Sequence, residues 1–115
     1  MRFDFGTVVA VPFPFTDRDT SIRRPAVILS GHANFNAAAG HAVMAMITRQ
    51  GNKARWPLDC PITDLDAAGL PAPSLIRFKL FTLDQRLVIK ALGELSAADK
   101  KQLKKNLNAL LRAGD

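Results

Sequence analysis

Short apolar runs, separated by prolines, glycines and polar residues, dominate this chain and predict β-strands. The runs are five to eight residues long and rich in β-branched or aromatic side chains, which favours strands over helices. The run at 26–30 is apolar almost throughout, and we expect it to be buried on both faces. Between the runs, 31–40 predicts a loop of small residues and 64–71 predicts a turn or a single helical turn. The six expected strands span 8–13, 26–30, 41–48, 57–62, 75–81 and 86–92.

The fifth run shows the cleanest alternation of apolar and basic positions. Ile76, Phe78 and Leu80 fall on one face of a strand, whereas Arg77 and Lys79 fall on the other. We therefore expect one face to meet the core and the other to form a solvated basic surface.

The last part of the chain predicts an amphipathic helix that follows a break at Gly93. Ser96 suits the N-cap, with Asp99 three residues later in place of the usual glutamate of a capping box. Gly114 suits the C-terminal end. One helical stripe carries Leu103, Leu107, Leu110 and Leu111. The elements together predict a mainly β fold with a terminal helix, as a twisted sheet or a partly closed barrel, in one domain over 1–115.

Composition is that of an ordinary globular protein with a basic bias. The chain has 115 residues, 48% of them apolar, and a formal net charge of +6. Such a charge favours a polyanionic partner, although the four lysines at 100, 101, 104 and 105 read as a solvated helix face. The apolar runs are too short to span a membrane and the first residues lack the layout of a secretory signal, so we expect a cytoplasmic protein.

The sequence Arg23-Arg24-Pro25 places two guanidinium groups at the expected entrance of the second strand. A side chain at such a place is fixed and yet open to solvent, which suits an arginine that handles phosphate. Further basic residues recur at strand ends and in the loops between them, and they form one basic surface if those ends converge. These are Arg49, Lys53, Arg55, Arg77 and Lys79.

Neither a metal nor a cofactor is expected. Cys60 is the only cysteine, so no intrachain disulfide or thiolate cluster can form. His32 and His41 invite an acid and base pair, but they flank a loop of small residues and are expected to be incidental. Asp17 and Asp19 lack the further ligands that a metal site needs.

Several motifs in order along the chain resemble those of the PemK/MazF toxins of bacterial toxin–antitoxin systems. The similarity begins with GTVVAVPFPFTD at 6–17 and RRPAVILS at 23–30. It continues in order through MIT, PSLIR, TLD and LGELS, at 46–48, 73–77, 82–84 and 92–96. The resemblance implies an SH3-like antiparallel barrel that forms a homodimer, cleaves single-stranded RNA without a metal and is silenced by a cognate antitoxin. We expect apolar residues around the third strand and the terminal helix to form the dimer interface.

The resemblance assigns catalysis to Arg24 and Thr48. In that family the 2′-hydroxyl attacks the neighbouring phosphate and leaves a 2′,3′-cyclic phosphate and a 5′-hydroxyl. A guanidinium suits the charge that gathers on the phosphate oxygens, and a threonine hydroxyl can hold the same phosphate in line. Taken without the resemblance, Thr48 is equally an ordinary strand-end residue and Arg24 a surface arginine.

Candidate RNA-binding residues surround this pair. Arg23 is expected to grip the backbone, while Gln50 and Ser74 can hydrogen-bond bases or phosphate. Arg77 either lines the groove or pairs with an acid. Trp56 either stacks on a base or packs at the rim of the core or at a dimer interface.

Two departures from the family and two rival functions stay open. The loop at 16–22 is shorter than in many such toxins, and the segment 51–60 carries less of the family pattern. The first rival is a gyrase inhibitor, because CcdB toxins share the expected fold. The second is a noncatalytic basic module that binds RNA or protein.

Overall fold

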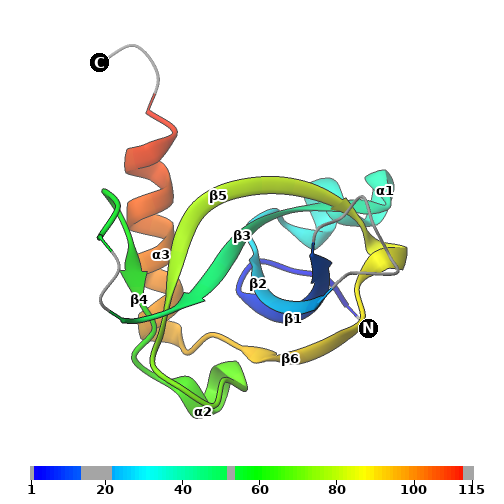
Figure 1. The fold of residues 1–115 in the computed structure, drawn as a ribbon. Helices are drawn as coiled ribbons and strands as arrows, with labels where there is room; N and C mark the ends of the chain where they lie inside the picture. The colour runs from blue at the N-terminus through cyan, green and yellow to red at the C-terminus, as the bar shows by residue number, and fades with distance from the viewer. Residues whose placement is uncertain (1, 14–21, 52–53, 113–115) are drawn as a thin grey trace.

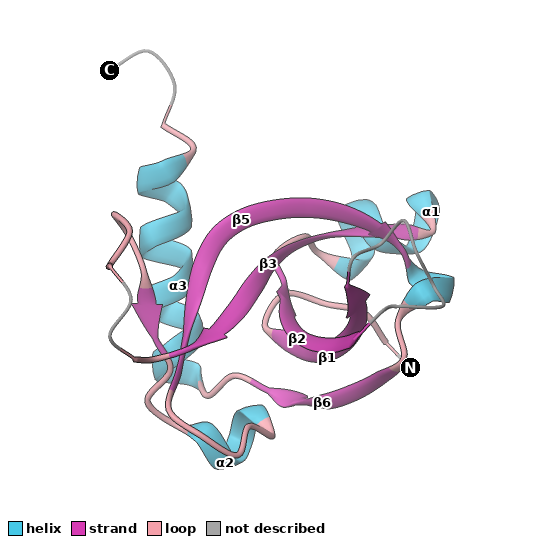
Figure 2. Ribbon diagram, viewed as in Figure 1, coloured by secondary structure: helices cyan, strands magenta, loops and turns pink. Residues whose placement is uncertain are grey.

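The strands form one curled antiparallel sheet with a helix at its side. The computed structural model describes residues 2–13, 22–51 and 54–112. Within them the sheet has the order β4-β5-β3-β2-β1-β6, with every pairing antiparallel (Figure 1). The strands are β1 Thr7–Phe13, β2 Ile22–Ile28, β3 His41–Arg49, β4 Cys60–Pro61, β5 Ser74–Asp84 and β6 Lys90–Glu94. The helices are α1 Ala37–Ala39, α2 Leu65–Ala68 and α3 Ala97–Leu110, with a π-helical turn η1 His32–Asn36 and a 3₁₀ turn η2 Gln85–Leu87. The prediction of a mainly β, partly closed antiparallel barrel with a terminal helix is confirmed (Figure 2).

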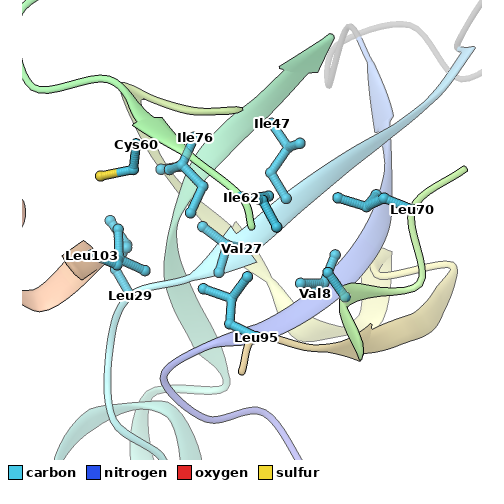
Figure 3. Packing of buried hydrophobic residues seen from close by; sticks show 12 residues of the cluster. Val8, Val27, Leu29, Ile47, Cys60, Ile62, Leu70, Ile76, Leu95 and Leu103 are labelled. Atoms are coloured by element: carbon cyan, nitrogen blue, oxygen red, sulfur yellow. The ribbon is translucent and has the colours of Figure 1, made fainter. Parts of the chain in front are cut away.

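Both faces of the sheet are buried, because successive residues of each strand enter different clusters. Val8 packs in the cluster beneath α3, whereas Val9 and Val11 pack in a second cluster inside the curl. The same alternation separates Val27 from Ile28. Figure 3 shows the cluster beneath α3, which gathers side chains from the strands, the loops and the helix.

The helix α3 begins as predicted but buries less than predicted. Ser96 is the N-cap, and its hydroxyl accepts a hydrogen bond of 3.2 Å from the Asp99 N–H. Leu103 is fully buried and Leu107 packs against the same cluster. The prediction is wrong for Leu110 and Leu111, which are 39% and 62% exposed because the helix extends past the sheet (Figure 1). Gly114 lies outside the described residues.

Several sequence-based boundaries are wrong, including that of the expected strand 57–62, which is only Cys60–Pro61. The strand β2 begins at Ile22, so Arg23, Arg24 and Pro25 lie within it and pair with β1 instead of standing at its entrance. The segment 31–40 forms η1 and α1 instead of a loop. The predicted strand 86–92 is divided between the turn η2 and β6, and β6 continues through Gly93 to Glu94.

The strand β5 also departs from strict alternation. Ala45 pairs with Leu80 and Met46 pairs with Arg77, so Phe78 and Lys79 have no partner on β3. This bulge turns Leu80 outward to 42% exposure and leaves Arg77 only 9% exposed. The predicted solvated basic face is therefore correct for Lys79 and wrong for Arg77. None of the described helices has the length and apolar character of a membrane span.

Candidate functional site

The site opens where β2 and β3 part. These strands pair only from Ala26 to Ile28, and Ala26 lies opposite Met46. The same register, continued by two residues, sets Arg24 level with Thr48, but the strands make no pair there. Pro25 suits this point because proline has no N–H to donate to a neighbouring strand. A pocket of about 350 Å³ fills the resulting gap, and both Arg24 and Thr48 line it.

Arg24 carries a buried hydrogen-bond donor that no described residue satisfies. Its Nε atom is buried and has no hydrogen-bond partner among the described residues. The guanidinium carbon lies 5.2 Å from the centre of the Phe13 ring at the end of β1. A buried N–H without a partner costs free energy, so an acceptor that enters the pocket is favoured.

Several residues with oxygen or nitrogen donors share the pocket with this pair. Arg23 and Arg49 line it from β2 and β3, and Ser74 lines it from the start of β5. The opposite wall is the segment 70–72 that follows α2. A second pocket adjoins the first at Arg24 and Thr48, and is further lined by Phe13, Met46, Ile47, Arg77 and Lys79. The structure thus brings four of the six predicted site residues, Arg23, Arg24, Thr48 and Ser74, to one pocket.

The charged side chains of the described residues that line this region are all positive. No aspartate or glutamate is among the described residues that line these two pockets or the neighbouring one. Arg23, Arg24 and Arg49 form no ion pair with any described residue. Cations without counterions around a concave surface raise the local concentration of anions.

Gln50 and Ser74 lie together at the edge of the site, with their side chains engaged locally. The Gln50 side-chain amide donates to the Ser74 carbonyl at 3.5 Å, and the Ser74 hydroxyl donates to the Ala72 carbonyl at 2.8 Å. Gln50 lines a third pocket with Arg49 and Arg55 rather than the Arg24 pocket. Ser74 is 5% exposed, so its hydroxyl is less accessible to a ligand than the sequence predicted.

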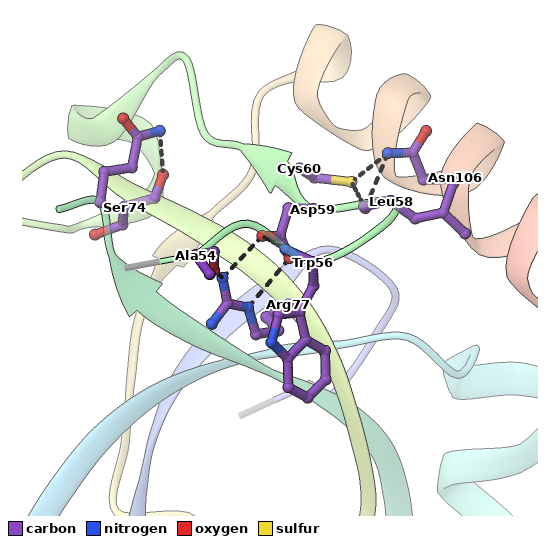
Figure 4. A network of polar contacts seen from close by, with 9 residues as sticks. Ala54, Trp56, Leu58, Asp59, Cys60, Ser74, Arg77 and Asn106 are labelled. Carbon is purple, nitrogen blue, oxygen red and sulfur yellow. Dashed lines mark hydrogen bonds and ion pairs between the residues drawn. The ribbon is translucent and has the colours of Figure 1, made fainter. Parts of the chain in front are cut away.

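Arg77 forms the ion pair that the sequence left open as an alternative. Its Nε donates to Asp59 Oδ1 at 3.2 Å and its Nη2 donates to Oδ2 at 2.9 Å (Figure 4). A further bond of 3.1 Å reaches the Ala54 carbonyl. Burial alone would raise the pKa of Asp59, but the bonds from Arg77 and from the Trp56 N–H outweigh it and hold that pKa below its ordinary value. The bond to Asp59 raises the pKa of Arg77.

Two residues of the site carried no usable signal in the sequence. Asp59 is 18 positions away from Arg77, so nothing in the sequence predicted their pairing. Phe13 read as the end of an apolar strand, and only the fold places its ring against Arg24. Asp17 and Asp19 lie outside the described residues. So does the rest of the loop 16–22, apart from Ile22.

The remaining candidates are not part of this pocket. His41 bonds the Ala39 carbonyl through Nδ1, while His32 lies near Asp4, whose carboxylate accepts from its backbone N–H. Burial raises the pKa of the Cys60 thiol, which is in contact with Asn106. In the described ranges no group of three or more His, Cys, Asp or Glu side chains is placed to hold a metal ion.

Solved structures similar to this chain are toxins and nucleases. MazF from Deinococcus radiodurans is 23% identical with a TM-score of 0.71, covering 96% of this chain and 97% of that one. An endoribonuclease in complex with its cognate antitoxin, from a mycobacterial species, is 17% identical with a TM-score of 0.73, covering 96% and 93%. The Mycobacterium tuberculosis toxin MazF-mt6 is 17% identical with a TM-score of 0.67, covering 90% and 93%. At such identities these structures show a shared fold.

The family is shown by the sequence itself. No curated protein sequence matches the chain closely enough to count as a relative. A family model, however, matches residues 4–111, a range that includes every strand and helix given above. The chain therefore belongs to the PemK-like, MazF-like toxins of type II toxin–antitoxin systems.

Proposed function

We propose that this toxin is a metal-independent endoribonuclease that cleaves single-stranded RNA at the pocket between β2 and β3. The observation that carries the proposal is Arg24, whose buried Nε has no partner in the described part of the chain and which shares two adjoining pockets with Thr48. Family membership supports the same activity, because endoribonuclease activity is typical of MazF-like toxins.

The proposed reaction is an internal transesterification. The 2′-oxygen forms a bond to phosphorus while the bond from phosphorus to the 5′-oxygen breaks. The 2′-hydroxyl loses a proton and the departing 5′-oxygen gains one, so the products carry a 2′,3′-cyclic phosphate and a 5′-hydroxyl. Negative charge gathers on the nonbridging oxygens in the transition state, and a fixed cation stabilises it most when water is excluded.

Arg24 supplies that charge. A guanidinium can donate two parallel hydrogen bonds to one phosphate, and the contact with Phe13 limits its orientations. Proton donation to the leaving oxygen is a lesser role, since the pKa of arginine is above about 12. Thr48 donates a hydroxyl hydrogen bond to the same phosphate and holds it in line with the 2′-oxygen.

The other lining residues bind the strand. Arg23 and Arg49 contact the phosphates on either side, where they raise affinity without changing the barrier. Ser74 and Gln50 form the edge against which the next nucleotide lies. Arg77 contributes a neutralised, rigid side chain to the second pocket.

The direct test incubates the purified protein with a pool of single-stranded RNA in EDTA and maps the new ends. We expect cleavage that leaves 5′-hydroxyl ends, and no cleavage of the same pool made with 2′-deoxy sugars. Arg24→Ala and Thr48→Ala should both lose activity, whereas Arg86→Gln, an exposed residue remote from the pocket, should not. Intact RNA together with growth arrest in cells overturns the proposal, and gyrase trapped on DNA in such cells favours the gyrase inhibitor.

The proposed partners follow from the family. Complexes of MazE with MazF are among the similar structures, so we propose a cognate antitoxin for this chain as well. We also propose a homodimer, in which apolar residues near β3 and α3 such as Leu110 and Leu111 are covered. A monomeric mass at micromolar concentration contradicts the dimer.

A further inference from the structure

We propose that Trp56 is a stacking platform for an unpaired nucleobase of the RNA strand that passes through the Arg24 pocket. The proposal rests on the proposed function for the identity of the strand. The proposal gives a binding role to the loop between β3 and β4. The sequence pattern of the family does not supply this role, because the segment 51–60 matches that pattern less clearly than the rest of the chain.

The position of Trp56 connects it to the site. Its ring lies beside Arg77 (Figure 4), with the ring centre 5.0 Å from the guanidinium carbon. The ring centre also lies 5.2 Å from Lys79 Nζ. Arg77 and Lys79 both line the second pocket, together with Arg24 and Thr48. The tryptophan is therefore one side chain away from the second pocket, which adjoins the pocket proposed to hold the scissile phosphate.

The backbone that carries Trp56 is held in place before any ligand arrives. The Trp56 backbone N–H donates to Asp59 Oδ2 at 2.9 Å, and the Asp59 N–H donates back to the Trp56 carbonyl at 3.3 Å. The same carboxylate holds Arg77, so the turn and β5 are locked together. Leu58 closes this turn with a φ of 66°, a left-handed conformation that leucine adopts only at a cost.

The Trp56 side chain nevertheless remains open to solvent. It is 44% exposed although two cations lie against it, and it is a member of neither buried cluster. A core residue would be expected to bury its ring, so packing at the rim of the core does not account for its rigid presentation. Stacking needs what the site offers, a rigid aromatic surface that loses little freedom on binding.

The surrounding charge selects nucleic acid as the occupant. Arg49, Arg55 and Arg77 line the pocket next to the loop, and Lys79 lies against the ring itself. The carboxylate of Asp59, which bonds the Trp56 backbone, has a side chain only 2% exposed and is neutralised by Arg77. A base on Trp56 would thus have cations nearby to meet its flanking phosphates.

The chain offers a probe for this contact, because Trp56 is its only tryptophan and it has no tyrosine. The titrant is a single-stranded 2′-O-methyl oligonucleotide of random sequence, prepared both with and without a fluorescein label. It lacks the attacking hydroxyl and therefore stays intact. Binding is followed by anisotropy of the labelled strand and stacking by tryptophan emission with the unlabelled one. We expect emission to fall saturably along the same binding curve. A duplex of the same sequence, whose bases are already stacked, should leave the emission unchanged.

Variants separate stacking from a merely structural role. Trp56→Ala should weaken oligonucleotide binding about tenfold, and Trp56→Phe should retain most of the affinity. Phe35→Ala, which removes a similarly exposed aromatic residue from η1, should change nothing. Circular dichroism and thermal unfolding of each variant report whether the fold is intact.

The outcomes distinguish this inference from the proposed function. Oligonucleotide binding with unchanged tryptophan emission, or Trp56→Ala affinity equal to that of the intact protein, overturns the inference while RNA cleavage can still stand. Emission that falls on binding, in a protein that cuts no RNA, supports the inference and removes the proposed catalysis. Absence of any oligonucleotide binding overturns the inference as well.

Discussion

Replacing Asp99 with asparagine should destabilise the fold by detaching α3 from the segment that leads into the wall of the pocket. The Asp99 carboxylate is 6% exposed and accepts hydrogen bonds from the Thr63 N–H, the Thr63 hydroxyl and the Asp64 N–H. The last of these, at 3.0 Å, goes to Oδ2 alone. Asp64 is itself the N-cap of α2, which precedes the pocket wall at 70–72. A single carboxylate thus ties the terminal helix to the site.

The magnitude follows from the bonds that asparagine cannot make. Its one oxygen can keep the bonds at Oδ1, but its NH₂ group then faces the Asp64 N–H, which loses its acceptor. One hydrogen bond to a charged group contributes about 1.5–3 kcal/mol. We expect a loss of about 2 kcal/mol, which lowers the melting temperature by about 8 °C for a chain of this size.

The stability difference should also depend on pH. Burial alone would raise the pKa of Asp99, but the bonds from Asp64 and Thr63 outweigh it and hold that pKa below its ordinary value. A carboxyl whose pKa is lowered by folding stabilises the protein above the unfolded pKa of about 3.9, and this contribution is lost as pH falls through the folded pKa. The gap between the two proteins should therefore be full at pH 7 and shrink below about pH 4.

Urea denaturation across this pH range measures the gap. Asp66→Asn is the matched control, because Asp66 is an exposed carboxylate on α2 and should shift stability little. Equal stabilities of Asp99→Asn and the unchanged protein at pH 7, or a gap that grows as the solution becomes acidic, would refute the reasoning.

Two further predictions concern backbone strain and a surface carboxylate. A Cβ at Gly69 would lie 2.0 Å from a backbone oxygen of β6 at a φ of 72°, so Gly69→Ala should cost more than about 2 kcal/mol in urea denaturation. Gly40→Ala, with a φ of 68° and open space, should cost about 1 kcal/mol, and Gly51→Ala almost nothing; equal costs for all three would contradict the contact. The hydrogen bonds from Arg86 lower the pKa of Asp84 to about 2, which carboxyl ¹³C NMR titration should detect. In Arg86→Gln that pKa should rise part of the way towards about 3.9, and an unchanged value would exclude the ion pair as its cause.

Local patterns predicted the elements of this fold well where one principle governed them. The runs at 8–13 and 41–48 became β1 and β3 within one residue at each end, because both faces of these strands are buried. Ser96 predicted the start of α3 because an N-cap is a local interaction.

The errors arise where distant residues decide the outcome. Arg23 and Arg24 were expected at the entrance of the second strand, but pairing with β1 extends β2 through them. The bulge that buries Arg77 depends on the partner strand β3, and the acid that receives it lies on another loop. The run at 86–92 is interrupted because Asp84 caps η2, a side-chain bond that apolar periodicity does not report.

The candidate residues could be named from the sequence, but their geometry could not. The motif at 23–25 and the end of the third strand pointed to Arg24 and Thr48 by resemblance, and the divergence of β2 and β3 places both in one pocket. The Arg24 Nε that lacks a partner among the described residues, and the ion pair that ties the Trp56 turn to Arg77, depend on the tertiary fold, so only the structure displays them.

The central claim is that Arg24 stabilises the transition state of RNA cleavage, and the single-turnover rate constant at saturating protein tests it most directly. With a single-stranded RNA cleaved in EDTA as substrate, Arg24→Ala should lower this constant at least about hundredfold, since it removes the charge that meets the phosphate oxygens. A single-turnover constant equal to that of the unchanged protein, in a variant with the same melting temperature, would contradict the account.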